Sequence, residues 1–492
     1  MSTRRYLTIA LLLSSLFIIG NLYGSFELGT KYNMIPAYNT FQNSPKSFNN
    51  PLYTKLISQS SELVFGDHPY TQHKLAADKN GNVVALYNNN YKQNLYFSAV
   101  RYFPIDTDLQ SCNYYHYLSD HTSNNSTVLI NNEGMGWHIW CIGNKKLCTQ
   151  YFDLRSNYYG NVDAETVEEV GQGRFKAAAN YNSSYGTYAL IVFESGKKLY
   201  AKAYRNGGTW TGRIKISDVK LPGVHDNQNY LSVEMNDAGR GWVLFCDKKR
   251  TTLYARYFDL TKNVPNSDWG KCWEGTTNVS STEGKGTYGT LKIAMNGKNG
   301  ILAWIKQNPY KEDIHESLSL ETRSTSGPHF EGSTVLREKE IVSYDITLLN
   351  KLIIACAKDP IFYKKEKTDI EILKNNNEIL FKIFDKRPGE TKLRVSPNKD
   401  VILLAYGDFP QRLDKTPSTN NKLKYCLYDI KTDKFIKEIV SIDESKCLSN
   451  FDISFANDNT LVFLYSVGGY NALPMFSDFR RLLITRIPIY KL

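Results

Sequence analysis

The sequence predicts an all-β protein, a single β-propeller of seven or eight mostly four-stranded antiparallel blades. Three observations lead to this fold class. First, an apolar strand, a polar turn rich in Gly, Asn or Asp, and a second apolar strand recur along nearly the whole 492-residue chain. Second, the second strand ends in an aromatic residue in seven of eight units, at intervals of 49 to 59 residues. Third, a further strand, often of the form L-Y-A-x-x-Y, follows after a short polar loop.

The eight units share this strand, turn and strand in the same order. They are LAADKNGNVVALY from Leu75, VLINNEGMGWHIW from Val128, AAANYNSSYGTYALIVF from Ala177, LSVEMNDAGRGWVLF from Leu231, LKIAMNGKNGILAW from Leu291, ITLLNKLIIACA from Ile346, LRVSPNKDVILLAY from Leu393 and ISFANDNTLVFLY from Ile453. The second strands end at Tyr87, Trp140, Phe193, Phe245, Trp304, Ala357, Tyr406 and Tyr465. The sixth unit departs furthest from the pattern.

Period-two alternation and enrichment in Val, Ile, Tyr, Phe and Thr identify these segments as strands, and the short turns make them antiparallel hairpins. No small sheet of this size buries both of its faces alone, so stacking around an axis is expected. Closure also removes exposed sheet edges, which favours a ring over an open solenoid. We assign residues 71–492 to the propeller. A leader at 25–70 could complete the last blade, so seven and eight blades both fit.

The N-terminus has the layout of a secretory signal over residues 1–24. Arg4 and Arg5 precede an apolar run from Tyr6 to Ile19, and small residues follow. The sequence therefore predicts export to the periplasm, the envelope or the medium. Because Leu22 would lie where a small residue is preferred at the cleavage site, an uncleaved anchor over residues 6–23 is the alternative, and it would be the chain's contact with a membrane.

Eight cysteines are too few for a disulfide-built scaffold, but they could pair in an oxidising compartment. Cys141 and Cys148 flank a predicted tight turn at 143–146, where residues face each other across a hairpin. They are the candidate disulfide. Two buried free thiols are the alternative.

The units resemble the tandem repeats of roughly fifty residues found in many exported bacterial proteins. That repeat has the pattern A-x-D-x-x-G-N-A-x-A-V-W followed by an I-Y-A-x-R-Y strand, and residues 77–87 and 253–257 match it best. The resemblance covers residues 71–310 well and the remainder loosely. It implies a propeller-like exported protein without a defined activity.

Turn residues offer two interpretations. Two turns place carboxylate and amide oxygens near a glycine, as calcium loops do: Asp78, Asn80 and Gly81, and Asn236, Asp237 and Gly239. The full ligand series is absent, and the same turn recurs in every unit. Asn, Asp and Gly tolerate the backbone that such turns need. The sequence therefore favours a structural turn, with no metal and no cofactor.

Known catalytic motifs are absent or incomplete. The stretch from Ala203 matches the S-x-D-x-G-x-T-W box of sialidase-like propellers at Gly207, Thr209 and Trp210, but Ala203 and Arg205 replace its serine and aspartate. The acidic cluster at residues 165–169 is best explained as a solvated loop. There is no H-E-x-x-H, C-x-x-C, G-x-S-x-G or phosphate loop.

The net charge of +11 is spread over the chain with acids interleaved. This pattern predicts a solvated basic surface and no nucleic-acid partner. The recurring aromatics predict packing between sheets, with a carbohydrate platform as the alternative. The resulting hypothesis is an exported, non-enzymatic binding or scaffold protein whose loops on one propeller face hold a protein or glycan ligand. The alternative is a secreted carbohydrate-active hydrolase or lyase with its site at the propeller mouth.

Overall fold

The computed structural model divides the chain into two units, Met1–Lys55 and Leu56–Leu492. All described residues belong to the second unit, so the predicted signal or anchor lies outside them. The described residues are 59–66, 73–92, 95–104, 115–119, 122–142, 145–156, 158–166, 175–205, 208–222, 229–280, 286–308, 318–338, 341, 343–349, 352–357, 368–374, 378–385, 388–408, 422–442, 448–457, 459–468 and 480–489.

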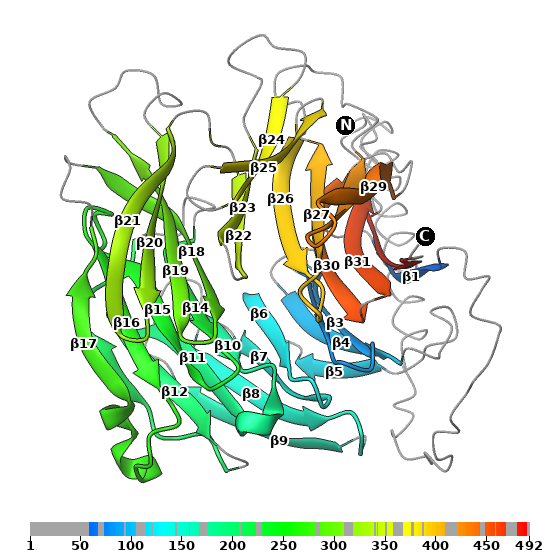
Figure 1. The fold of residues 1–492 in the computed structure, drawn as a ribbon. Helices are drawn as coiled ribbons and strands as arrows, with labels where there is room; N and C mark the ends of the chain where they lie inside the picture. Colours follow the sequence, from blue (N-terminus) through cyan, green and yellow to red (C-terminus); the bar gives the residue numbers. More distant parts are fainter. Residues whose placement is uncertain are drawn as a thin grey trace, which may run out of the picture. The chain divides into compact units, whose positions relative to one another are not determined.

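These residues form eight four-stranded antiparallel sheets that follow the chain (Figure 1). The first sheet contains β2 (His73–Ala77), β3 (Val83–Lys92), β4 (Leu95–Phe103) and β5 (Tyr115–Ser119). The second contains β6 (Thr122–Ile130), β7 (Met135–Ile142), β8 (Lys146–Asp153) and β9 (Tyr158–Thr166). The third contains β10 (Phe175–Ala179), β11 (Tyr188–Ser195), β12 (Lys198–Arg205) and β13 (Ile214–Ser217). The fourth contains β14 (Leu231–Met235), β15 (Arg240–Cys246), β16 (Leu253–Asp259) and β17 (Trp273–Asn278).

The remaining four sheets repeat this arrangement. The fifth contains β18 (Thr287–Asn296), β19 (Asn299–Gln307), β20 (Leu318–Ser326) and β21 (His329–Glu338). The sixth contains β22 (Ser343–Leu348), β23 (Leu352–Ala357), β24 (Thr368–Lys374) and β25 (Glu378–Asp385). The seventh contains β26 (Pro388–Val395), β27 (Val401–Asp408), β28 (Leu423–Asp429) and β29 (Lys434–Ser441). Two short 3-10 helices, η2 (Ser183–Tyr185) and η3 (Asn266–Cys272), lie in connections.

The eighth sheet joins segments from both ends of the described chain. It contains β30 (Leu448–Asn457), β31 (Thr460–Gly468) and β32 (Arg480–Pro488), with β1 (Gln59–Gly66) hydrogen-bonded to β32 as the fourth strand. Strand β1 lies inside the 25–70 leader. The last sheet is therefore completed by residues that precede the first sheet in sequence.

The first strands of the eight sheets contact one another in a closed cycle. Strands β2, β6, β10, β14, β18, β22, β26 and β30 each contact the next, and β30 contacts β2. A second link joins the ends of the cycle, because the guanidinium of Arg486 donates hydrogen bonds to the carbonyls of Phe103 and Pro104, each at 2.9 Å. The all-β, propeller-like class that the sequence predicts is thus confirmed.

The hydrophobic core lies between neighbouring sheets. Each cluster of buried side chains combines residues of two consecutive sheets, as when Val192 of β11 packs in the same cluster as Val243 of β15. The aromatic residues that end the second strands belong to this core. Trp140, Phe193, Phe245, Trp304, Tyr406 and Tyr465 are all buried. Burial confirms sheet packing for these six and rules out a carbohydrate platform formed by them.

The candidate disulfide between Cys141 and Cys148 is not formed. In the β7–β8 hairpin Cys141 faces Leu147, while Cys148 faces Trp140. Because successive side chains of a strand point to opposite faces, this offset of one residue places the two thiols on opposite sides of the sheet. Both cysteines are buried and neither is in a disulfide, which is the alternative that the sequence left open.

The recurring turn is held by its own polar side chain. The Asp78 carboxylate accepts hydrogen bonds from the backbone amides of Asn80 and Asn82, both at 2.9 Å, and from the Asn82 side chain at 2.8 Å. Asn131 repeats this arrangement by accepting from the amides of Glu133 and Met135 at 3.0 Å. The side-chain oxygens therefore cap turn amides, which accounts for Asp and Asn at this place without a cation.

Candidate functional site

One residue of each first strand contributes to a ring of mostly charged side chains, which we call the inner ring. Its members are Lys74, Thr127, Lys176, Ser232, Lys292, Asp345, Lys392 and Asp452. In seven sheets this residue pairs with the residue that directly precedes the aromatic end of the second strand. In the sixth sheet Asp345 pairs with Ala355. The inner ring is therefore one column of the repeat.

Three members of the inner ring are joined by ion pairs with one another or with Arg394, and we call this group the paired arc. It consists of Asp345, Lys392 and Asp452 with Arg394, which follows Lys392 on the same face of β26. The Arg394 guanidinium lies 3.2 Å from the Asp345 carboxylate and 3.5 Å from that of Asp452. The ammonium of Lys392 lies 3.3 Å from Asp452 and 3.5 Å from Glu390.

Both acids of the paired arc are held in the ionised form. Burial alone would raise the pKa of Asp345, but Lys292, Arg394 and the Leu393 amide together lower it. Burial likewise opposes ionisation of Asp452, and nearby Lys392, Lys74 and Arg394 hold its pKa well below the usual range. These carboxylates are therefore acceptors and counter-ions at neutral pH, and they have no proton to donate.

The other five members of the inner ring carry an excess of positive charge, and we call them the cationic arc. Lys74, Lys176 and Lys292 alternate with the hydroxyl residues Thr127 and Ser232 along β2, β6, β10, β14 and β18. Lys292 lies 2.9 Å from Asp345 at the border with the paired arc. Within the described residues, Lys74 and Lys176 make no ion pair, and both are exposed to solvent.

The lysines of the cationic arc affect one another's protonation. The side chain of Lys176 is exposed, but the protein atoms crowded around it remove part of its hydration. This desolvation, together with the charges of Lys74 and Lys292, lowers the pKa of Lys176 to about 8. The pKa of Lys74 is also lowered, because burial and the charges of Lys392 and Arg394 outweigh the opposing attraction of Asp452. Since both side chains are reached by water, solvent screening limits these effects.

Electrostatic interactions reach across the ring to sheets that are not neighbours. Glu234 of β14 interacts with Asp345 of β22 and with Arg394 of β26. Burial and the Asp345 charge raise the pKa of Glu234 to about 7 against the opposing influence of the Met235 amide and Arg394. Charges on strands two and three positions apart in the cycle thus share one interior region.

One end of the ring is tied by hydrogen bonds between turns. We call this end, where first and second strands join, the turn end. The Lys79 amide donates to the Asn132 carbonyl at 3.3 Å, and the Asn132 amide donates to the Tyr181 carbonyl at 2.7 Å. Further links of the same kind are Asn180 to Asp237, Asn236 to Gly297, and Lys399 to Asn296. The last link joins the seventh sheet to the fifth and does not involve the turn of the sixth.

The residues singled out in the sequence lie away from the inner ring. Glu165 of β9 is a partner of Lys202 at 3.0 Å and Arg213 at 3.5 Å, while residues 168 and 169 lie outside the described part. Trp210 packs edge-on against Trp137 and Tyr204. The Arg205 guanidinium donates to the Leu260 carbonyl at 3.0 Å and so joins the third and fourth sheets.

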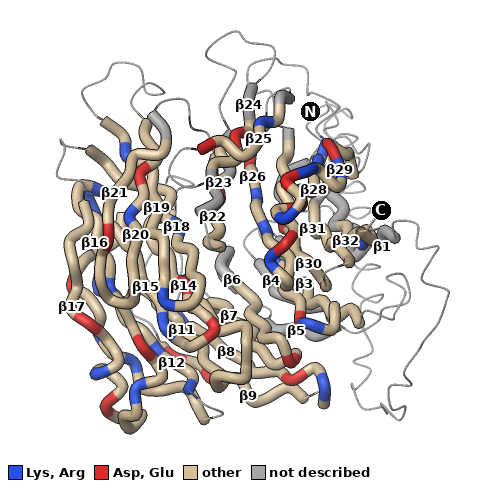
Figure 2. Tube along the Cα trace, in the orientation of Figure 1, with Lys and Arg blue, Asp and Glu red and all other residues tan. Residues whose placement is uncertain are grey.

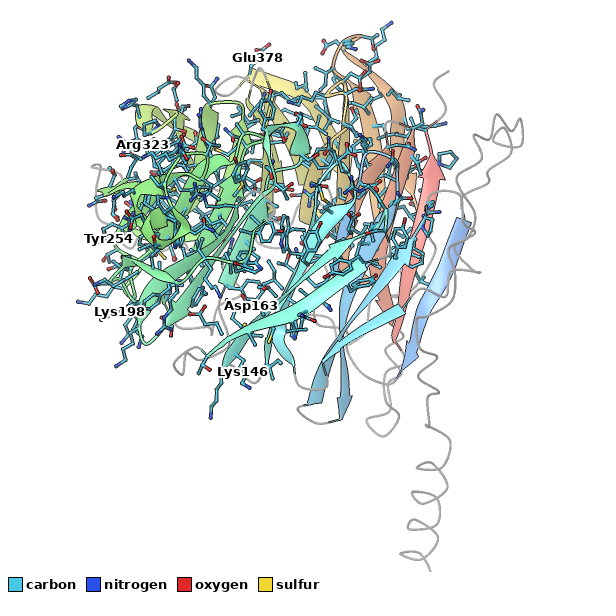
Figure 3. All side chains as sticks on the ribbon, turned by 90° about the horizontal axis from the view of Figure 1, so that it is seen from below. Lys146, Asp163, Lys198, Tyr254, Arg323 and Glu378 are labelled. Atoms are coloured by element: carbon cyan, nitrogen blue, oxygen red, sulfur yellow. The ribbon has the colours of Figure 1, made fainter. Side chains whose placement is uncertain are left out.

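Charges elsewhere on the described residues are mixed in sign. Figure 2 shows Lys and Arg interspersed with Asp and Glu over the sheets. In Figure 3, Lys146, Lys198 and Tyr254, which belong to the third strands β8, β12 and β16, lie toward the outer side of their sheets. Within the described ranges, no group of three His, Cys, Asp or Glu side chains could hold a metal ion.

The sequence interpretation missed the inner ring, although the repeat contains the signal that locates it. Its members are 47 to 60 residues apart, so they look scattered along the chain. Aligning the units where the first strand meets the turn, at residues such as Asp78, Asn180 and Asn296, places a column four residues earlier that contains Lys74, Lys176, Lys292, Lys392 and Asp452. A charged column in an otherwise apolar strand indicates a shared interior position.

No family model and no curated protein matches the chain, so the resemblance to the tandem-repeat family stays a prediction. Solved structures with similar folds include Sqt1 from Chaetomium thermophilum, with 7% identity, TM-score 0.46 and coverage of 88% of this chain and 100% of that one. The WD40 domain of SCAP from fission yeast has 7% identity, TM-score 0.45 and coverage of 87% and 94%.

A prolyl endopeptidase has 10% identity and TM-score 0.45, over 80% of this chain. The chain spans about half the length of that enzyme, 53%. We transfer no ligand and no activity from these structures. Among the described residues, no helix is both long enough and apolar enough to span a membrane.

Proposed function

We propose that the chain is an exported, non-enzymatic binding protein built as an eight-bladed propeller, with its protein or glycan ligand held at the inner ring. The observation that carries the proposal is the cationic arc, where Lys74 and Lys176 face solvent without an ion pair among the described residues. Charged groups that only stabilise the fold are normally paired, as the paired arc is. Export rests on the N-terminal sequence pattern, outside the described residues.

The turn end suggests how the ligand enters. Hydrogen bonds between turns run from the first sheet to the fifth and on to the seventh. Among the described residues, links between sheets at the opposite end join fewer sheets, as Asn229 bonds to Leu291 and Thr391 bonds to Ser343. We therefore place the entrance at the opposite end, where the chain enters the first strands. Tyr230, Ser343 and Glu390 lie there, each two residues before the inner-ring residue of its sheet.

A second candidate, a carbohydrate-active hydrolase, is favoured by one pair of groups. The pKa of Glu234 is raised to about 7, while that of Asp345 is lowered, and the two carboxyl groups interact. Glycoside hydrolysis uses a protonated acid opposite an ionised carboxylate. In this alternative Glu234 would donate the proton and Asp345 would act as the base. Against it, Asp345 already has two cations and a backbone amide as partners.

A thermal-shift screen of the purified protein against glycans and small metabolites tests the binding proposal. A ligand present at 100 times its dissociation constant stabilises the folded state by about 2.7 kcal/mol. Binding predicts a selective shift that is lost in Lys176→Gln and kept in Lys198→Gln, without consumption of the ligand. Release of sugar that stops in Glu234→Gln would instead establish the hydrolase.

A further inference from the structure

We propose that the cationic arc is an anion site, which takes a carboxylate or phosphate group of the ligand between Lys74, Lys176 and Lys292. This inference rests on the proposed binding function and adds the chemical class of its ligand. It follows from the spacing of charges in the inner ring, from the partners that these charges have or lack, and from the donors between them.

The partners of the ring's charges are unevenly distributed. Asp345 accepts from Lys292 at 2.9 Å and from the Leu393 amide at 2.9 Å, and it lies 3.2 Å from Arg394. Asp452 has an equally complete set of partners. The acids of the ring are therefore satisfied. Neither forms an ion pair with Lys74 or Lys176, although the Asp452 charge favours the protonated form of Lys74.

The lysines of the cationic arc repel one another. Lys176 lies two first strands from Lys74 on one side and two from Lys292 on the other, and both neighbours disfavour its charged form. Among the described residues, no acid offsets this effect on the pKa of Lys176. Lys292 already has Asp345 as a counter-ion, but Lys74 and Lys176 have no ion pair among the described residues, so their charges raise the free energy of the folded state unless an anion joins them. Binding an anion there relieves a repulsion that the protein otherwise bears.

The donors of the cationic arc fit an oxyanion. Each ammonium supplies three donors on a flexible stem, and the hydroxyls of Thr127 and Ser232 lie in the same column between the lysines. Both hydroxyl residues are half-buried. Charge-assisted hydrogen bonds to carboxylate or phosphate are about twice as strong as neutral ones. Lys74 and Lys176 are exposed, so an anion can reach them without displacing another side chain.

Titration calorimetry with two probes tests the site. Inorganic phosphate and glucuronate are titrated into the full protein at fixed ionic strength, with chloride as the screening anion. Saturable binding of either probe is expected, and the tighter probe identifies whether phosphate or carboxylate is the natural group. The substitution Lys176→Gln should weaken the binding of the tighter probe about tenfold, because it removes one charge-assisted hydrogen bond.

Two further variants serve as controls. Lys198→Gln removes an exposed lysine from β12 of the same sheet and should leave the affinity unchanged. Lys176→Arg keeps the positive charge and should still bind the probe. An absence of saturable binding, or an equal loss in Lys176→Gln and Lys198→Gln, would overturn the anion site. If a neutral glycan binds while both probes fail, the binding function stands and the anion site alone is rejected.

Discussion

The carboxylate of Asp452 accepts a hydrogen bond from the backbone amide of Leu75 at 2.9 Å, and so joins the first strands of the last and first sheets. The two residues are 377 positions apart in the sequence. Asp452 also pairs with Lys392 and Arg394 of the preceding sheet. One buried side chain thus connects three consecutive first strands where the cycle closes.

Asp452→Asn should therefore destabilise the protein strongly. The substitution leaves Lys392 and Arg394 without their shared counter-ion, a loss expected to cost about 3 kcal/mol. Urea denaturation at pH 7 measures it. Because the folded-state pKa is depressed, this stabilisation exists above the unfolded-state pKa and is lost as the pH falls toward the folded-state value. The difference in free energy of unfolding between the unsubstituted protein and Asp452→Asn should therefore become smaller in acid. Asp218→Asn, at an exposed residue, should leave the midpoint unchanged.

Gly241 lies where a side chain would collide with the inner-ring strand. A Cβ added at Gly241 would be 1.9 Å from the Glu234 carbonyl oxygen and 2.7 Å from the Phe258 ring. Gly241→Ala must therefore displace β14, and we expect a loss of more than about 3 kcal/mol. The control is Gly212→Ala, because nothing lies within 4 Å of a Cβ at Gly212. Similar unfolding midpoints for the two variants would contradict the packing described here.

The affinity for glucuronate should fall as the pH rises above about 8. Lys176 loses its proton there, and one linked proton changes affinity by at most about tenfold per pH unit. Glu234 ionises near pH 7, and its negative charge also lowers the affinity for glucuronate as the pH rises. Asp345 and Asp452 stay ionised throughout. Lys176→Arg stays charged, so its affinity should persist to higher pH. Identical pH profiles for the two proteins would exclude Lys176 as the titrating group.

Glu234→Gln should stabilise the protein above pH 7. The folded-state pKa of Glu234 is raised above its ordinary value, so its contribution to stability falls as the pH rises from about 4.5 to about 7. Glutamine does not ionise, so the variant does not lose stability over this pH range. Because the side chain is half-buried, we expect a gain below about 2 kcal/mol. Chemical denaturation at pH 5 and pH 8 should show the gain at pH 8 alone; an equal effect at both values would argue against ionisation as its cause.

Cys141 and Cys148 should behave as buried thiols in the folded protein. Burial raises the pKa of Cys148 to about 11, which keeps the reactive thiolate scarce at neutral pH. Alkylating reagents should modify both residues only after unfolding. Peptide mapping without reductant should find neither cysteine in a disulfide. A Cys141–Cys148 cross-link recovered from native protein would mean that the β7–β8 register differs from the one described.

The fold was predictable because its determinants are local. Turn residues such as Asp78 and strand-ending aromatics such as Trp140 recur at regular intervals, and each specifies a hairpin by itself. The register was harder to predict. A one-residue offset across the β7–β8 turn separates Cys141 from Cys148, and residue spacing does not reveal it. The inner ring was missed because its function depends on the meeting of distant strands, where Glu234 interacts with Arg394 of a sheet three positions away.

The pairing of β1 with β32 determines when the molecule can be completed. Ribosomes make β1 before every other described strand and β32 after all of them, so the earliest strand has no partner until synthesis is almost finished. A nascent chain therefore carries a free strand edge, which can pair wrongly with other chains. Closure is a post-translational event, and a protease or chaperone that recognises β1 would distinguish unfinished molecules from mature ones.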